Sequence, residues 1–97
     1  MALKKVKICK YNNLYQLQFK ARDLMKKKNK SNLEKAIKIH TNILNLIKNY
    51  EDLNMYDQAL SKTMKMQNKM ELREIKLSSI LLRMKAYKKQ FNYTSAY

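Results

Sequence analysis

The sequence predicts an all-α protein: a three-helix bundle with a long overhanging third helix and an extended basic N-terminal arm. The 97 residues contain no glycine and no proline, which tight turns and hairpins usually need. Apolar residues recur at spacings of three and four, the periodicity of amphipathic helices. The length suits one small core, so residues 1–97 are expected to form a single domain.

Residues 1–12 are expected to form the arm, because lysines are interleaved there with apolar side chains. The arm lysines are Lys4, Lys5, Lys7 and Lys10. A first helix is expected over about residues 14–28, with Asn13 as its N-cap. A lysine-rich loop follows it.

A second helix is expected to begin just after Ser31, which forms a capping-box pattern with Glu34. Its broad apolar face and near-neutral charge are typical of the packed centre of a domain. The apolar pattern stops near Tyr50, and three polar residues there are candidate caps for the next helix: Glu51, Asp52 and Asn54.

A third helix is expected over about residues 55–90, with a seam in which Arg73 is the only charge. At 1.5 Å per residue the second helix would be roughly 28 Å long and the third roughly 54 Å, so the third would overhang from near Arg73. A sharp kink at Arg73 that folds the overhang back is the alternative. The uncovered apolar side chains are candidates for a protein interface: Leu77, Ile80, Leu81, Met84, Tyr87 and Phe91.

The net charge of +15 comes from 22 Lys and Arg against 7 Asp and Glu. Such a charge favours nucleic acid as the partner first, an anionic membrane second and acidic protein surfaces third. Two basic clusters, the loop and the overhang, are expected to meet at one end of the bundle. The candidate nucleic-acid-binding residues are Lys4, Lys5, Lys7, Lys10, Lys20, Arg22, Lys26, Lys27, Lys28, Lys30, Arg73, Lys76, Arg83, Lys85, Lys88 and Lys89.

Residues that could carry catalysis or bind a metal are few. His40 is the only histidine and lies on the apolar face of the second helix, where a hydrogen-bonded core residue is expected rather than a metal ligand or a catalytic base. Cys9 is the only cysteine, which excludes an internal disulfide. Tyr93 and Tyr97 near the C-terminus, like Tyr11 and Tyr15, could stack on unpaired bases, but packing is the preferred role. We therefore expect no enzyme, no cofactor, no metal, no small-molecule substrate and no membrane span.

Three short segments resemble known families. KARDL at residues 20–24, with Lys69 and Arg73, is similar to a helical-hairpin protein of the large ribosomal subunit, although the small residue and hydroxyl that flank that family's basic pair are missing. LLRMKAYKK at residues 81–89 is similar to a helix of a small-subunit ribosomal protein, whose preceding turn is absent here. EKAIKIHTNIL at residues 34–44 resembles a tetratricopeptide helix or the second helix of a microtubule-interacting-and-transport domain.

The charge favours a structural RNA-binding protein, a small ribosomal protein that contacts rRNA phosphates and neighbouring proteins of a large assembly, and the resemblances suggest architecture only. The alternative is a helical protein-interaction module of the transport-domain or tetratricopeptide kind. A membrane-surface or coiled-coil assembly subunit is a third class. The ribosomal interpretation implies a cytoplasmic location, and a mitochondrial one stays open because the first acidic residue is Asp23.

Overall fold

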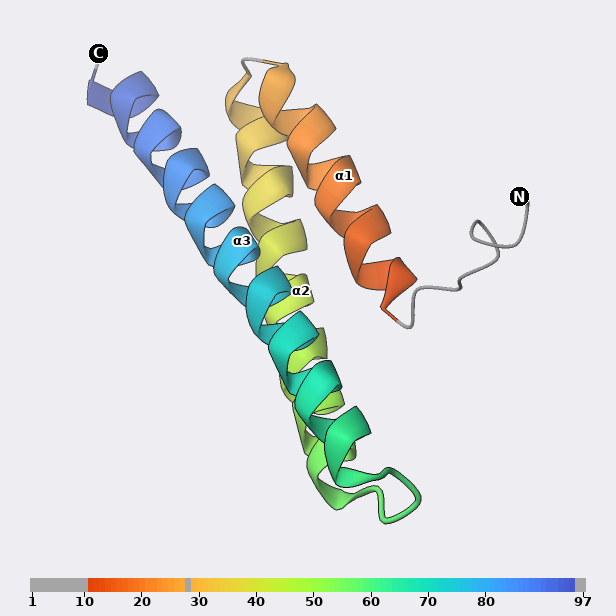
Figure 1. Cartoon of the computed structure of the whole chain (residues 1–97). Helices are drawn as coiled ribbons and strands as arrows, with labels where there is room; N and C mark the ends of the chain where they lie inside the picture. The colour runs from red at the N-terminus through yellow and green to blue at the C-terminus, as the bar shows by residue number, and fades with distance from the viewer. Residues whose placement is uncertain (1–10, 28, 96–97) are drawn as a thin grey trace, which may run out of the picture.

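The computed structural model describes the backbone of residues 11–27 and 29–95 and the side chains of residues 11–27 and 29–91. These residues form three α-helices and no strand: α1 (Asn12–Lys26), α2 (Lys30–Tyr56) and α3 (Lys62–Ser95) (Figure 1). The predicted all-α three-helix bundle is confirmed. Of the predicted arm, residues 1–10 with their four lysines lie outside the described part, and Asn12 already belongs to α1.

The starts of α1 and α2 differ from the predicted ones by about two residues. Asn13 is not an N-cap, because it lies inside α1 and its Nδ2 donates a hydrogen bond to the Tyr50 hydroxyl over 3.0 Å. At α2 the cap is Asn29, whose side-chain oxygen accepts from the backbone N–H groups of Ser31 at 2.9 Å and Asn32 at 3.4 Å. The predicted cap Ser31 is therefore the second residue of the helix.

The end of α2 was predicted too early, because its polar residues pair with α3 instead of ending the helix. Asn54 donates from Nδ2 to the carbonyl oxygen of Lys65 over 2.9 Å and accepts from Asn68 Nδ2 over 2.9 Å. Glu51 lies 3.9 Å from the ammonium of Lys76. The turn instead spans residues 57–61, and Ser61 Oγ accepts from the Met64 N–H at 3.2 Å at the start of α3.

The length of α2 removes the predicted overhang. With 27 residues against 34 in α3, the two helices are roughly 40 and 51 Å long. α3 is one continuous helix without a kink at Arg73, and it packs along α2 as far as Ala86, which belongs to the same buried cluster as Leu33 near the start of α2. The overhang from Arg73 was wrong because the third helix starts later, and the second ends later, than predicted.

The core consists of two apolar clusters. One contains Tyr11, Leu14, Ile43, Ile47, Leu72 and Ile75, and the other Ala21, Met25, Leu33, Ala36, Ile37 and Ala86. One buried polar residue of each helix lies in sequence between its members of the two clusters: Gln18, His40 and Ser79. We call these three residues the polar layer. Gln18 Nε2 donates to Ser79 Oγ over 2.8 Å and to the Ile75 carbonyl oxygen over 3.2 Å.

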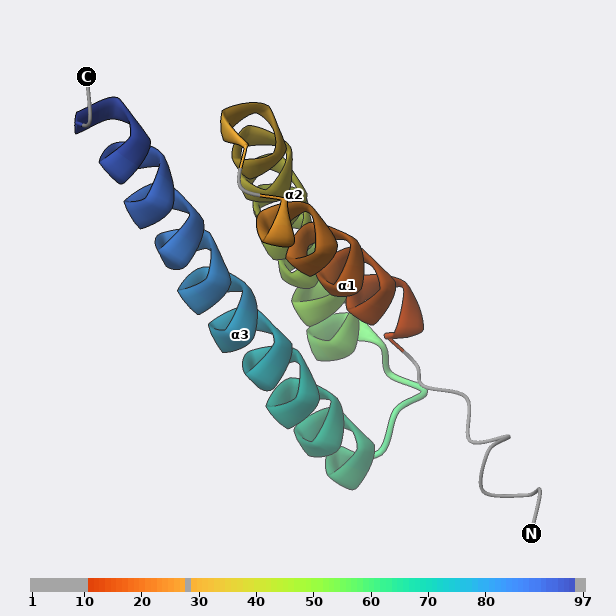
Figure 2. The same ribbon diagram turned by 90° about the horizontal axis from the view of Figure 1, so that it is seen from above.

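α1 covers only part of the hairpin that α2 and α3 form. It begins beside Tyr50, where the Tyr11 and Tyr50 rings meet edge to face with centroids 5.1 Å apart, and ends near the start of α2. Beyond the start of α1, on the far side of Tyr50, α2 and α3 continue as a pair (Figures 1 and 2). We call residues 51–70 the hairpin tip. Several of its large apolar side chains are exposed: Leu53, Met55, Tyr56, Met64, Met66 and Met70. The uncovered end of the bundle is thus the hairpin tip.

Candidate nucleic-acid interface

Basic side chains gather at one end of the bundle. The end of α1, the start of α2 and the last turns of α3 lie together at that end (Figure 1). Residues 20–38 and 83–89, which supply these segments, contain twelve Lys and Arg but only two carboxylates, Asp23 and Glu34. We call this region the cationic end. Eleven of its basic residues are described: Lys20, Arg22, Lys26, Lys27, Lys30, Lys35, Lys38, Arg83, Lys85, Lys88 and Lys89.

The rest of the bundle is close to neutral. Residues 39–82 carry six basic and five acidic side chains. Between residues 11 and 91, nearly all the net positive charge therefore belongs to the cationic end. Such a one-sided field attracts a polyanion to one end of a molecule and orients it there.

Most cations of this end are solvated and lie on the surface. Lys26 approaches Asp23 at 3.9 Å, but both side chains are more than 70% exposed, so this pair contributes little to stability and leaves the ammonium accessible. The Arg22 guanidinium lies 5.8 Å from the centroid of the exposed Phe19 ring, a cation–π distance. These groups can exchange water for phosphate oxygens without disturbing the core.

Arg83 differs from the others because it also joins two helices. Its Nη1 donates to Thr41 Oγ1 of α2 over 3.2 Å, and the side chain is half-buried. Its positive charge also adds to burial in lowering the pKa of His40, with burial the larger cause. We assign Arg83 a mainly structural role.

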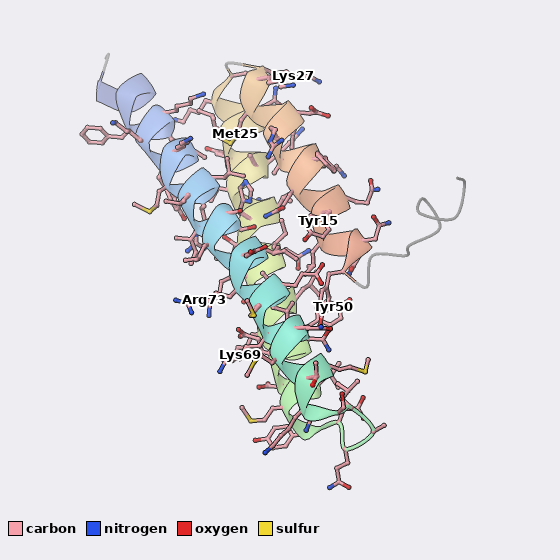
Figure 3. The ribbon with its side chains drawn as sticks, in the orientation of Figure 1. Tyr15, Met25, Lys27, Tyr50, Lys69 and Arg73 are labelled. Atoms are coloured by element: carbon pink, nitrogen blue, oxygen red, sulfur yellow. The ribbon has the colours of Figure 1, made fainter. Side chains whose placement is uncertain are left out.

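Two predicted site residues lie away from the cationic end. Figure 3 shows Lys27 at the end of the bundle and Arg73 well away from it, in the first half of α3. Fifteen residues separate Arg73 from Lys88, a rise of roughly 22 Å along α3. Lys76 lies in the same middle region and faces Glu51. The expected meeting of the loop with these two residues does not occur, because α2 is longer than predicted.

Of the remaining predicted residues, Lys4, Lys5, Lys7, Lys10 and Lys28 lie outside the described part of the chain. The arm joins α1 at Tyr11, the end of α1 opposite the cationic end. The sequence reading missed Lys35 and Lys38, which are exposed at the start of α2. Their position opposite the apolar face of that helix was a usable signal, but the near-neutral charge of the helix as a whole hid it.

The predicted interface residues of α3 form part of a longer apolar surface. Leu77, Leu81, Met84, Tyr87 and Phe91 are exposed and Ile80 is half-buried, yet no overhang is involved. Instead, α3 turns a different face to α1 and α2, with Asn68, Leu72, Ile75, Ser79 and Ala86 buried. The predicted seam is thus on the outer side of the bundle.

The tyrosines near the start of α1 pack against protein. Tyr11 is buried against Tyr50, and burial, with Glu71 and Tyr50 as smaller causes, raises the pKa of its phenol above the usual 10.0. The Tyr15 hydroxyl donates to Glu71 Oε2 over 3.3 Å. Packing, the role preferred from the sequence, is what these two residues do in the fold.

The described residues offer few groups for metal binding. Within residues 11–27 and 29–95, no three His, Cys, Asp or Glu side chains come close enough to hold a metal ion. Cys9 lies outside the described residues. A pocket of about 520 Å³ opens at the hairpin tip, lined by residues of both charges including Glu51, Asp52, Lys62 and Lys69. It is far from the cationic end and is not part of this interface.

None of the described helices is long and apolar enough to span a membrane.

Comparisons of the chain with models of protein families, with curated proteins and with solved structures each found no match.

Proposed function

We propose that the cationic end binds the phosphate backbone of structured RNA, and that the protein is a structural component of a ribonucleoprotein particle such as a ribosome. The observation that carries the proposal is the collection of eleven described basic side chains, from three helices and the turn after α1, beside only two carboxylates. Lysines bind phosphates as point charges without reading base sequence. RNA therefore should be recognised by its backbone and shape.

The test is RNA binding by a pair of variants with equal charge change. One replaces Lys27, Lys30 and Lys88 at the cationic end by Gln, and the other replaces Lys48, Lys62 and Lys69 by Gln. All six side chains are exposed. Binding to a structured RNA hairpin is measured by fluorescence anisotropy over a salt series.

The cationic-end variant is expected to bind on the order of a hundredfold more weakly near 0.1 M salt, with a shallower slope of log affinity against log salt, because about three phosphate contacts are lost. The matched variant should stay close to the unmodified protein. Equal losses in both variants would refute a localised interface, and a flat salt response would refute phosphate binding altogether.

The assignment to a ribosome or related particle needs a second measurement. The protein expressed in its native cell should sediment with large RNA-containing particles in a sucrose gradient, and RNase treatment should release it. Retention on the particle after RNase digestion would point to protein contacts instead, as expected for the interaction-module alternative.

A further inference from the structure

The outer face of α3 carries a second regular stripe of apolar residues. Met66, Met70, Leu77 and Met84 are between 51% and 66% exposed although they belong to the longest helix of the bundle. The face of the same helix that packs on α1 and α2 includes polar residues, among them the buried Asn68 and Ser79. α3 therefore has apolar side chains on both sides, and only one side is used within the fold.

The spacing of the outer side chains suits a partner helix. Together with Arg73, Ile80 and Tyr87, these side chains follow one another at alternating steps of four and three residues. This is the heptad pattern that keeps one narrow seam facing another helix. The seam, which we call the α3 stripe, consists of Met66, Met70, Arg73, Leu77, Ile80, Met84 and Tyr87. An interfacial membrane helix usually shows a wider apolar face. Here Arg73 interrupts the seam near its centre.

The charges around the α3 stripe select the kind of helix. Lysines flank it on both sides: Lys62, Lys69 and Lys76 on one side and Lys88 on the other. The only carboxylates of α3 are Glu74 and Glu71, and Glu71 is half-buried and bonded to Tyr15 of α1. Parallel pairing in register with a second copy would set Arg73 against Arg73 within the seam, and antiparallel pairing would set the lysines of one flank opposite one another. Residues that flank a seam choose partners by opposite charge.

We propose that the α3 stripe binds an acidic amphipathic α-helix of another protein, which pairs with α3 as a two-stranded coiled coil. The partner supplies apolar residues at heptad spacing and Glu or Asp beside them, and a carboxylate meets Arg73 within the seam. From Met66 to Tyr87 the stripe runs roughly 32 Å, the length of three heptads. Three methionines give it side chains that adapt to the shapes of a partner's residues. The proposal does not depend on RNA binding.

The probe for this surface is a synthetic three-heptad peptide with Leu at the two seam positions and Glu at the flanking positions. A scrambled peptide of the same composition and charge lacks the seam and controls for simple attraction to a cationic protein. The full chain is titrated with both peptides. Binding is followed by fluorescence anisotropy, and helix formation by circular dichroism.

Two protein variants with the same charge change localise the binding. Leu77→Asp with Met84→Asp alters the α3 stripe, whereas Met64→Asp with Ser78→Asp alters exposed positions of α3 away from the stripe and its flanks. All four side chains are solvent-exposed, so both variants should fold, and thermal unfolding checks this. We expect the seam peptide to bind the unmodified chain and the off-stripe variant alike, and the stripe variant at least about tenfold more weakly.

Three outcomes would overturn the proposal. Equal binding of the seam and scrambled peptides would show that electrostatic attraction by itself accounts for the binding. Dimerisation of the chain in sedimentation equilibrium that is lost in the stripe variant would make a second copy the occupant. Stripe-dependent binding to vesicles containing anionic lipid, without peptide binding, would assign the surface to a membrane. A variant with only Lys27→Gln and Lys30→Gln, both outside α3, should still bind the peptide while losing RNA affinity, which separates this result from the RNA test.

Discussion

His40 lies in the centre of the bundle without a hydrogen bond to either ring nitrogen from any described residue. Of the polar layer it is the member without a partner, since Gln18 and Ser79 bond to each other. A buried polar group without a partner costs roughly 1–3 kcal/mol of folding free energy. The sequence reading placed His40 correctly on the apolar face, but it expected a hydrogen-bonded residue, because the surroundings of a side chain depend on packing between helices.

Acidification should destabilise the protein through His40. Burial and the nearby Arg83 lower the pKa of His40 below the usual 6.5, so the unfolded chain takes up a proton at a higher pH than the folded one does. The free energy of unfolding should therefore fall as the pH drops below about 6.5 and stop falling, for this group, below the lowered pKa. Denaturant unfolding at a series of pH values measures it.

Two substitutions separate titration from polarity. His40→Leu should raise the free energy of unfolding by about 1 kcal/mol and remove this part of the pH dependence, because an unpaired buried polar group is lost. His40→Asn should remove the same pH dependence without the gain in stability. An unchanged pH profile in both variants would show that another group titrates.

At the level of the helices, the number and type of elements could be predicted from residue spacing, but their ends could not. Glu51, Asp52 and Asn54 are good cap residues in isolation. They continue α2 because Asn54 and Glu51 find partners on α3, at Lys65, Asn68 and Lys76. Those partners are 11 to 25 residues away along the chain, and no local pattern reveals them.

Which face of α3 is buried also could not be predicted from the local sequence. The regular apolar seam through Met70 and Leu77 was the better core candidate by composition, yet the buried face is the one with Leu72, Ile75 and Ser79. Gln18 helps to decide between the faces, because its amide needs the Ser79 hydroxyl and the Ile75 carbonyl as acceptors. Which of two stripes is buried depends on such contacts with other helices.

The capping of α2 gives a prediction at this scale. Asn29→Ala should lower the free energy of unfolding by about 1 kcal/mol, because two backbone N–H groups lose their side-chain acceptor. Ser31→Ala is the matched control at the position that the sequence pattern favoured, and it should change stability by a few tenths at most. A larger loss for Ser31→Ala, measured by chemical denaturation, would place the cap there after all.

For the whole molecule, the strong positive charge is evident from the sequence, and two basic clusters were predicted to meet at one end of the bundle. The fold brings the loop after α1 and the last turns of α3 to one end. What could not be predicted is which part of α3 takes part. That depends on the length of α2, which places Lys85, Lys88 and Lys89 there and leaves Arg73 and Lys76 in the middle. The clear division between a cationic end and a nearly neutral remainder emerges only once three helices are aligned.

The short α1 should also divide the molecule into a more stable and a less stable part. Two continuous helices pass from a region packed on α1 into the hairpin tip, where Met55, Met64 and Met66 face solvent. Segments with few buried apolar contacts open locally at a lower free energy than the whole fold does. In native-state hydrogen exchange, amide protons of residues 62–70 should therefore exchange faster than those of residues 72–82, although both belong to α3.

The expected boundary near Leu72 should disappear when denaturant approaches the unfolding midpoint, because global unfolding then exposes all amides equally. Uniform protection along α3 in water would instead mean that the hairpin tip is held as firmly as the three-helix part. If the boundary exists, the two parts of α3 differ in local stability. The part packed on α1 opens only when the whole protein unfolds, whereas the part in the hairpin tip can lose or regain its helical order while the rest stays folded.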